Sequence, residues 1–501
     1  MRKLYSVFCI NLSFQSAAYL NRFILIKVWN LVQKSVALQP EVVHKNVYYR
    51  IKVVHKNVLL MKRDIYEKLL SWKESSTRMP LILNGARQVG KTWLLTEFGH
   101  REYKKLAMFS LDRNEAARKI FEQSGEPREL LRKLSALAGI DITAGDTLLF
   151  LDEIQDCPRA LTALKFFCEE TPEIHVAVAG SLLGISLHDQ SSYPVGKVDV
   201  IRMYPMTFSE FLRAVGREMM AEELDRGEWN ILSALDTTYK DLLRQYYYVG
   251  GMPAVVKSYA ATGQLQDVRR LQKRILADYE ADFSKHAPSS EVPRIRMVWN
   301  SIPAQLAKEN KKFIYGALKP GARASQFEMA IQWLQDAGLV YLTHRVSAVK
   351  MPLKFYEDFS AFKLYMLDVG LLGAMMDVTA AAILVKSNIF SEYKGAFTEL
   401  FVCTQLQGTD IPVYYYTAEN SRIEIDFAVQ LDSCVYPIEV KAEENLQSKS
   451  MKTFIQKHPE LTGLRLSMKP WISQGWLECI PLYAFREELI RKNNRQNEVQ
   501  V

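Results

Sequence analysis

The sequence predicts an α/β protein that starts with a parallel sheet and continues into a helical lid and two further domains. Between residues 61 and 211, short apolar runs alternate with helical patterns, as they do in parallel sheets with crossover helices. One run leads into a glycine-rich loop, and another ends in two acidic residues. Together these three features predict a nucleotide-binding sheet of the P-loop NTPase type.

The glycine-rich loop fits the pattern G-x-x-x-x-G-K-[ST]. Its residues are Gly85, Ala86, Arg87, Gln88, Val89, Gly90, Lys91 and Thr92. Glycines allow successive backbone N–H groups to surround a polyphosphate at the N-terminus of the following helix. In this interpretation Lys91 reaches the β- and γ-phosphates, and Thr92 offers its hydroxyl to Mg²⁺. The alternative is a glycine-rich turn between strand and helix that binds nothing.

The apolar run Thr147-Leu148-Leu149-Phe150-Leu151 ends in Asp152 and Glu153. Such a run is typical of a strand buried on both faces, and ligands bind at the carboxyl ends of these strands. We expect Asp152 to hold Mg²⁺ and Glu153 to orient the attacking water as a base. A solvated strand end is the alternative interpretation of the two acids.

A further strand, residues 176–179, ends in Gly180 and Ser181. Ser181 is the candidate sensor of the γ-phosphate, because a strand between the two nucleotide motifs would place it there. An ordinary Gly-Ser turn explains the same residues. No N-K-x-D element of guanine specificity is evident, so ATP with Mg²⁺ is the expected pair of ligands.

The composition indicates a globular protein of two to four domains. The chain has 501 residues, of which 48% are hydrophobic and 24% are charged, and a net charge of +8 that permits nucleic-acid binding. No apolar run is long enough for a membrane span, so no membrane partner is expected. The six cysteines show no paired spacing, which favours reduced thiols in a cytoplasmic protein.

Residues 1–60 form an atypical N-terminal extension. They contain a direct repeat with a period of 11, in residues 42–47 and 53–58. We interpret Met61 as the natural start and the extension as having little fixed structure. An amphipathic appendage for a partner or a membrane surface is the alternative.

The ATP-binding domain is expected to span residues 61–211. A helix over 63–73 precedes its first strand, and residues 105–112 and 198–204 read as further strands. Thr207 and Glu210, three residues apart, predict a capping box at the start of the next helix.

Residues 212–290 are expected to form the helical lid, interrupted by the break Gly250-Gly251-Met252-Pro253. A winged-helix domain is expected over 291–385. It consists of helices at 302–307 and 327–337 and paired strands at 339–342 and 362–366. Winged helices contact DNA or dock proteins, and both partners stay open here.

The last segment, residues 386–501, predicts a nuclease-like domain. A helix near 397–401 carries Glu399, and a hairpin carries Asp426 on one strand and Glu439 and Lys441 on the other. Carboxylates that share a hard cation beside a lysine suit metal-assisted phosphodiester hydrolysis. The hypothesis is therefore a second metal site of Glu399, Asp426 and Glu439, with Lys441 beside it.

The separation of 13 residues between Asp426 and Glu439 and the E-x-K triplet match the core of the restriction-endonuclease-like fold, PD-(D/E)xK. The alternative is a charged two-stranded surface. That alternative predicts that the four side chains do not cluster.

Taken together, these motifs resemble a prokaryotic family of AAA-type ATP-binding proteins. The family has a P-loop domain, a winged helix and a C-terminal domain of unknown function with a nuclease-like core. The resemblance covers Met61 to the C-terminus and is carried by residues 83–92, 151–155, 179–181, 204–211, 250–253 and 367–371, with Glu399, Asp426 and the triplet 439–441.

One segment departs from the family. Relatives usually carry Gly-Arg where this chain has Gly196-Lys197, and a lysine cannot reproduce the bidentate fork of arginine. An arginine finger is therefore unassigned, and Arg159 and Arg202 are the nearby candidates.

Three functions follow from the sequence. The first is an ATPase whose hydrolysis moves the lid and the winged helix, with DNA as a partner. The second is a metal-dependent nuclease regulated by ATP. The third is a nucleotide-gated switch in which the nuclease-like core is degenerate and binds a protein partner.

Overall fold

The computed structural model describes residues 62–180, 194–308, 311–384, 391–418, 423–442 and 449–499. The chain divides into two units, Met1–Leu60 and Met61–Val501, and all of the described residues belong to the second. The predictions about Ser181 and about residues 1–60 lie outside the described residues.

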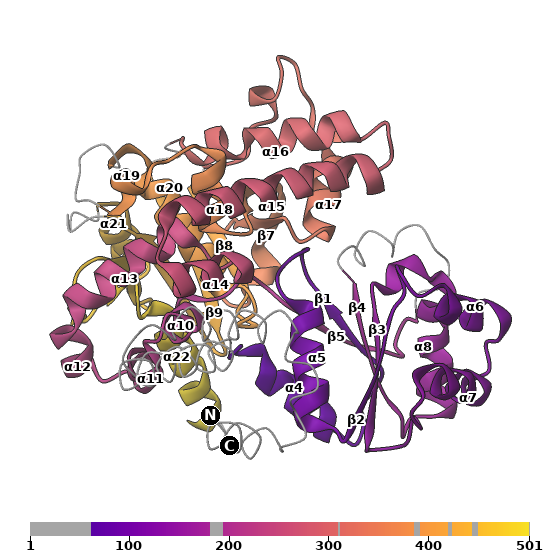
Figure 1. The fold of residues 1–501 in the computed structure, drawn as a ribbon. Coiled ribbons are helices and arrows are strands. Elements are labelled where there is room, and N and C mark those ends of the chain that lie inside the picture. Colours follow the sequence, from indigo (N-terminus) through magenta and orange to yellow (C-terminus); the bar gives the residue numbers. More distant parts are fainter. Residues whose placement is uncertain are drawn as a thin grey trace, which may run out of the picture. The chain divides into compact units, whose positions relative to one another are not determined.

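A five-stranded parallel sheet forms the first part of this unit (Figure 1). Its strands are β1 (Leu81–Asn84), β2 (Lys105–Ser110), β3 (Thr147–Asp152), β4 (His175–Gly180) and β5 (Asp199–Arg202). Their order is β2-β3-β4-β1-β5, and every neighbouring pair is parallel. Every residue of β3 and β4 is buried, because helices cover both faces of the sheet. The parallel α/β sheet predicted from the sequence is confirmed.

Helices cover the two faces in separate groups, with α4 and α5 on one side and α6, α7 and α8 on the other (Figure 1). Their bounds are α4 (Ile65–Glu74), α5 (Lys91–Glu102), α6 (Glu115–Gln123), α7 (Pro127–Ala138) and α8 (Pro158–Glu170), with a short 3₁₀ turn η2 (Ile154–Asp156). Alternate residues of β3 enter different cores: Leu148 and Phe150 pack with α5, and Leu149 and Leu151 pack with α8.

A helical block follows the sheet, as predicted. Its members are α10 (Phe208–Ala214), α11 (Glu218–Arg226), α12 (Trp229–Ala234), α13 (Asp236–Val249), α14 (Pro253–Thr262) and α15 (Leu265–His286). The Thr207 hydroxyl accepts from the backbone N–H of Glu210, and the Glu210 carboxylate accepts from that of Thr207, which confirms the capping box. The predicted break at 250–253 separates α13 from α14.

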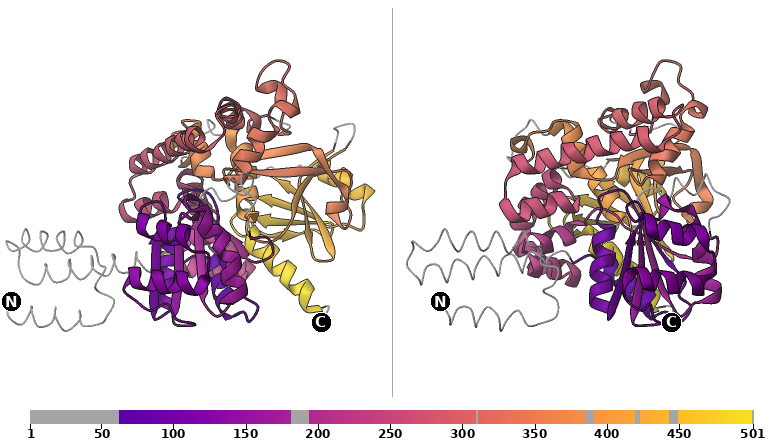
Figure 2. Two further views of the ribbon diagram at one scale, coloured as in Figure 1. Left: turned by 90° about the vertical axis from the view of Figure 1, so that its right-hand side faces the viewer. Right: turned by 45° about the vertical axis from the view of Figure 1, so that its right-hand side comes forward.

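An eight-stranded mixed sheet lies in the rest of the chain. Its strands are β6 (Val340–Val346), β7 (Glu357–Met366), β8 (Val413–Thr417), β9 (Glu424–Leu431), β10 (Cys434–Val440), β11 (Gly463–Ser467), β12 (Ile472–Ser473) and β13 (Leu477–Pro481). The order is β12-β13-β11-β10-β9-β8-β6-β7. Strand β6 pairs with β8, so residues 291–385 and 386–501 share one sheet (Figure 2).

The remaining helices flank this sheet. They are α16 (Val292–Leu306), α17 (Glu328–Asp336), α18 (Val369–Met375), α19 (Ala380–Leu384), α20 (Ser391–Leu406), α21 (Lys449–Lys457) and α22 (Phe485–Val499), with 3₁₀ turns η3 (Tyr315–Ala317), η4 (Ala324–Gln326) and η5 (Leu353–Tyr356). The helices and paired strands expected for the winged helix are present, and the winged-helix assignment itself stays a prediction.

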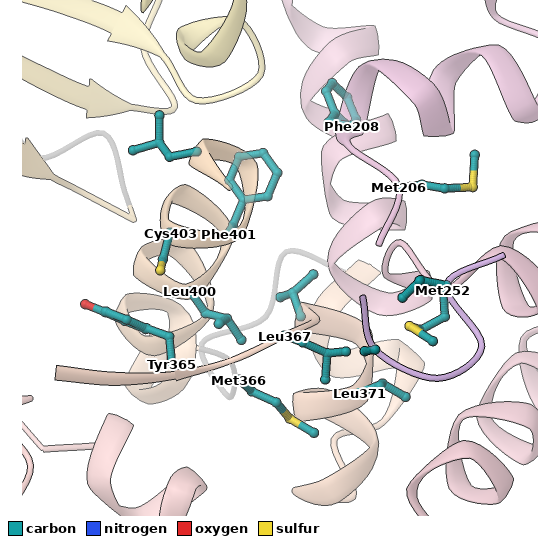
Figure 3. Packing of buried hydrophobic residues seen from close by; sticks show 14 of the residues in the cluster. Met206, Phe208, Met252, Tyr365, Met366, Leu367, Leu371, Leu400, Phe401 and Cys403 are labelled. Carbon is teal, nitrogen blue, oxygen red and sulfur yellow. The ribbon is translucent and has the colours of Figure 1, made fainter. Parts of the chain in front are cut away.

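Residues from distant parts of the chain share one core where the two sheets meet the helical block. Met206 and Phe208 pack there with Met252 of the 250–253 break, with Leu371 of α18 and with Phe401 of α20 (Figure 3). Through this shared core, the segment after β5 packs against helices α18 and α20.

Candidate nucleotide site and C-terminal charge cluster

The phosphate loop leads from β1 into the N-terminus of α5, as the motif requires. Gly85 has φ 150°, and a Cβ at this position would lie 2.2 Å from the carbonyl oxygen of Met203. Gly90 has φ 99° and is the N-cap residue of α5. The two glycines of the motif are thus required by close backbone packing and by a left-handed turn. The first N–H groups of α5 have no intrahelical acceptor, which suits an anion.

Lys91 is buried at the start of α5 and its ammonium faces the loop. Its Nζ donates to the carbonyl oxygens of Gly85, at 2.7 Å, and of Ala86, at 2.8 Å. Burial lowers the pKa of Lys91 to about 8, although Glu153 and Asp152 act in the opposite direction. A phosphate beside this ammonium would supply the negative charge that its buried position favours.

Thr92 and Asp152 meet at the end of β3. The Thr92 hydroxyl donates to Oδ1 of the Asp152 carboxylate at 3.1 Å, and Asp152 is buried. Burial raises the pKa of Asp152, while the bond from Thr92 lowers it. A hydroxyl and a carboxylate adjoining the phosphate loop are oxygen ligands of the kind that Mg²⁺ prefers, so these residues fit that ion.

Glu153 follows Asp152 in a left-handed backbone conformation, with φ 50°. Its Oε2 accepts a hydrogen bond from the Gln155 amide at 2.7 Å. A non-glycine residue with this φ is uncommon and often occurs at functional sites. The neighbouring strand β4 lies between β1 and β3, as expected for the strand that leads to Ser181.

Helix α15 contacts the phosphate loop through three side chains. Arg87 forms an ion pair with Asp282, and the Gln88 amide donates to Oδ2 of Asp278 at 2.8 Å. The Tyr279 hydroxyl donates to the carbonyl oxygen of Arg87 at 2.8 Å. The loop is therefore bonded directly to the helical block.

These contacts were not predicted from the sequence, although one signal was available. Asp278 and Asp282 are four residues apart and so lie on one face of a helix, with Tyr279 beside Asp278. The pattern shows the helical face, and only the fold shows that this face meets the loop.

Arg63 contacts the backbone of the phosphate loop, and this role was also not predicted from the sequence. Its guanidinium is buried and donates to the carbonyl oxygens of Val89, at 3.1 Å, and Tyr204, at 2.7 Å. It also pairs with Glu210 at 3.0 Å, which links the loop to the capped start of α10. A lone arginine before a helix carries no sequence signal for this role.

The two candidates for an arginine finger have other partners. Arg159 donates to the carbonyl oxygen of Glu122 at 3.3 Å, and Arg202 hydrogen-bonds Tyr204. Lys197, which stands where relatives carry arginine, pairs with Glu169 at 3.1 Å. None of the contacts named for Arg159, Arg202 and Lys197 involves the phosphate loop.

In the C-terminal part, Glu399 of α20 is buried among cations. It pairs with Lys311, and its Oε2 lies 3.7 Å from Nζ of Lys363. Its Oε2 also accepts from the Tyr365 hydroxyl at 3.2 Å. Burial raises the pKa of Glu399, but the two lysines outweigh burial and lower it.

Lys363 is 1% exposed and also pairs with Glu424 at 2.9 Å. Burial lowers its pKa, but the surrounding carboxylates, first Glu399, outweigh burial and raise it. The lysine therefore remains charged and compensates the acids around it.

Asp426, Glu439 and Lys441 lie on the predicted hairpin of β9 and β10. Oδ2 of Asp426 accepts from the backbone N–H of Val440 at 2.8 Å, which places it beside the E-x-K segment. Nζ of Lys441 lies 3.1 Å from Oε1 of Glu439, so the two share a face as expected. Oε2 of Glu439 lies 3.8 Å from Arg465.

Burial raises the pKa of Asp426 to about 7, with Glu399 acting in the same direction. Among the described residues, no group of three or more His, Cys, Asp or Glu side chains is arranged to hold a metal ion. The second metal site of Glu399, Asp426 and Glu439 stays a prediction. Two lysines, Lys311 and Lys363, lie beside Glu399.

The parallel sheet, the glycine-rich loop and the Thr92–Asp152 pair are the arrangement of a P-loop NTPase domain. The AAA domain family matches residues 77–212. Residues 240–382 match a family described as Domain of unknown function (DUF8612), and residues 394–478 match one described as Domain of unknown function (DUF4143).

No curated protein matches the chain. Among solved structures, the Walker-type ATPase PABY2304 of Pyrococcus abyssi is similar, with 13% identity and a TM-score of 0.42. The match covers 63% of this chain and 96% of that one. In the described parts of the chain, no helix has the length and apolarity needed to cross a bilayer.

Proposed function

We propose that the chain hydrolyses ATP with Mg²⁺ and transmits the nucleotide state to its helical block. The observation that carries this proposal is the bond between Thr92 and Asp152, which joins the end of the phosphate loop to the acidic end of β3. A hydroxyl and a carboxylate in this relation are the metal-holding pair of P-loop enzymes. The match to the AAA domain family supports the same activity.

In this proposal the loop N–H groups and Lys91 bind the phosphates, and Thr92 and Asp152 hold Mg²⁺. When bound, the ion neutralises charge that develops on the phosphate oxygens. Glu153 orients the attacking water and accepts its proton, and Ser181 contacts the γ-phosphate or that water. Arg63 and Glu210 act as positioning residues, because Arg63 bonds the loop backbone at Val89 and Glu210 pairs with Arg63.

Coupling to the helical block would run through α15. Arg87 and Gln88 lie within the phosphate loop, and both are bonded to carboxylates of this helix. A nucleotide that draws Arg87 toward its phosphates competes with Asp282 for the same guanidinium. Binding and hydrolysis of ATP would thereby change the contact between the phosphate loop and the helical block.

For the C-terminal part, a nucleotide-gated binding role is the second candidate function. The observation that favours it over metal-dependent cleavage is the pairing of Glu399 with Lys311 and Lys363, because a carboxylate neutralised by two ammonium groups is a poor ligand for Mg²⁺. Action on DNA through residues 291–385 remains part of the proposal. If the nuclease interpretation held instead, Asp426→Ala and Lys441→Ala would each stop Mg²⁺-dependent cleavage of DNA or RNA.

The test is ATP turnover by the full chain, with and without single- and double-stranded DNA. We expect Mg²⁺-dependent turnover in the wild type and its loss in Lys91→Ala. The matched control is Lys104→Ala, since Lys104 is an exposed lysine of the same domain whose partner is Asp146. Normal turnover in Lys91→Ala would contradict the site assignment.

A further inference from the structure

The segment from the end of β6 to the start of β7 presents two aromatic side chains to solvent, Phe355 in the turn η5 and Phe359 in β7 itself. Phe355 is 79% exposed and Phe359 is 73% exposed. Among the described residues these are the two most exposed large aromatic side chains, and they lie four residues apart. Met351, in the same loop, is 51% exposed. Soluble proteins rarely expose such a group of apolar side chains without a binding role.

The segment that carries the exposed rings is packed against the eight-stranded sheet. Val349 and Leu353 of this loop are buried, and the Leu353 N–H donates to the Gln430 side chain of β9 at 3.0 Å. The Phe359 ring packs edge-on against His344, with ring centroids 5.3 Å apart. The loop is therefore fixed to the eight-stranded sheet, Phe359 is part of that sheet, and both aromatic side chains are exposed on this supported surface.

Two exposed lysines lie in the same segment as the rings. Lys350 and Lys354 are exposed, and in the part of the chain that the structure describes neither has a carboxylate at ion-pair distance. The nearest acids in sequence are used elsewhere: Glu357 hydrogen-bonds His344 at 2.7 Å, and Asp358 pairs with Arg345. Hydrogen bonds from Ser360 and Arg345 lower the pKa of Asp358 to about 2, so it stays ionised within that pair.

We propose that this surface, made of Phe355, Phe359, Lys350 and Lys354, binds single-stranded nucleic acid. Exposed aromatic rings stack on unpaired bases, and nearby lysines neutralise the phosphates that connect those bases. In a duplex the bases are already stacked and their faces are hidden, so the same rings have no partner there. The inference deepens the proposed action on nucleic acid and rests on it.

The experiment measures binding of fluorescent single-stranded oligothymidylate, and of the RNA of the same length, to the full chain by anisotropy. We expect Phe355→Ala and Phe359→Ala each to weaken binding about fivefold or more, which is the low end for one base stacked on an aromatic ring. Lys350→Ala and Lys354→Ala should each reduce the slope of log affinity against log salt by about 0.7. Comparing the two strands shows whether DNA or RNA is preferred.

The matched control is Met329→Ala, because Met329 is 66% exposed but lies on α17. Its affinity should equal that of the wild type. Unchanged binding in the double variant of Phe355 and Phe359, or no binding of single strands by the wild type, would overturn the inference. ATP turnover without nucleic acid is measured in the same variants and should be unaffected, so failure of the surface and failure of the ATPase are distinguishable.

Discussion

Lys91 carries a positive charge in a buried position, and this shapes how the site responds to pH. Burial lowers its pKa to about 8, so the charged form is disfavoured until an anion approaches. A bound polyphosphate favours the ammonium and raises the pKa again. Above pH 8, nucleotide binding must therefore be accompanied by uptake of a proton.

The affinity for ATP is therefore expected to fall as the pH rises above 8. The affinity for a fluorescent ATP analogue should be steady below pH 8 and should weaken as the pH rises from 8 to 9.5, by up to about tenfold per pH unit. In Lys91→Met, affinity should be lower at every pH and nearly independent of pH in this range. A wild-type affinity that is flat between pH 7 and 9.5 would show that Lys91 does not carry the phosphate charge.

The site residues that the sequence predicted are those with local signals. Gly85, Gly90 and Lys91 follow a fixed spacing, and Asp152 ends an apolar run, so each was found without knowing the fold. Arg63 and Asp282 were not, because their partners Glu210 and Arg87 lie 147 and 195 residues away. Contacts between residues so distant in sequence produce no periodic pattern in the sequence from which they could be predicted.

Helix α15 connects the phosphate loop to the helical block through Asp278 and Asp282. The charge of Asp282 is expected to affect ATP binding. Asp282→Asn should tighten ATP binding about fivefold, because it removes a negative charge near the phosphates and frees Arg87. Binding of the analogue at fixed salt is the measurement. Asp267→Asn is the control, since Asp267 lies at the opposite end of the helix and pairs with the exposed Arg270. Weaker binding in Asp282→Asn would contradict the competition for Arg87.

The break between α13 and α14 holds the helical block against α18. The Asp368 carboxylate accepts from the N–H of Gly251 at 2.6 Å and from that of Leu371 at 2.9 Å. A Cβ on Gly251 would lie 2.2 Å from the carbonyl oxygen of Met206. The sequence predicted the break from its glycines and proline, but Asp368 as its partner came only from the fold.

We expect Gly251→Ala to destabilise the protein by about 3 kcal/mol, because the added methyl group meets backbone atoms that cannot move aside. Urea unfolding of the full chain measures this. Gly125→Ala should change stability by less than about 0.5 kcal/mol, because a Cβ there meets nothing within 4 Å. Equal stability of the two variants would argue against the close packing at Gly251.

Across the whole molecule, the eight-stranded sheet is the feature that the sequence predicted least well. Strands β6 to β10 were expected, and so was the hairpin of β9 and β10, because alternation and turn residues are local. Strands β11, β12 and β13 were not predicted. The parallel pairing of Arg345 with Tyr415 joins strands 70 residues apart and has no such signal. The side-chain partners of Glu399 were likewise unpredictable, since Lys311 and Lys363 come from different elements.

The charge cluster around Glu399 is expected to support the fold of this sheet. Glu399→Gln should lower the free energy of unfolding by about 3 kcal/mol, because it leaves buried ammonium groups without their main partner. Lys441→Met, at a more exposed ion pair, should cost less than about 1 kcal/mol. If Glu399→Gln instead kept full stability while abolishing a Mg²⁺-dependent cleavage, the metal-site interpretation would be supported.

Glu153 is the residue proposed to activate water beside the phosphate loop, and hydrolysis depends most on it. The direct measurement is a comparison of ATP binding and ATP turnover in Glu153→Gln, which keeps the shape of the side chain and removes its basicity. We predict that this variant still binds ATP with wild-type affinity while its turnover falls at least about 100-fold. Turnover at the wild-type rate would contradict the proposed ATPase site.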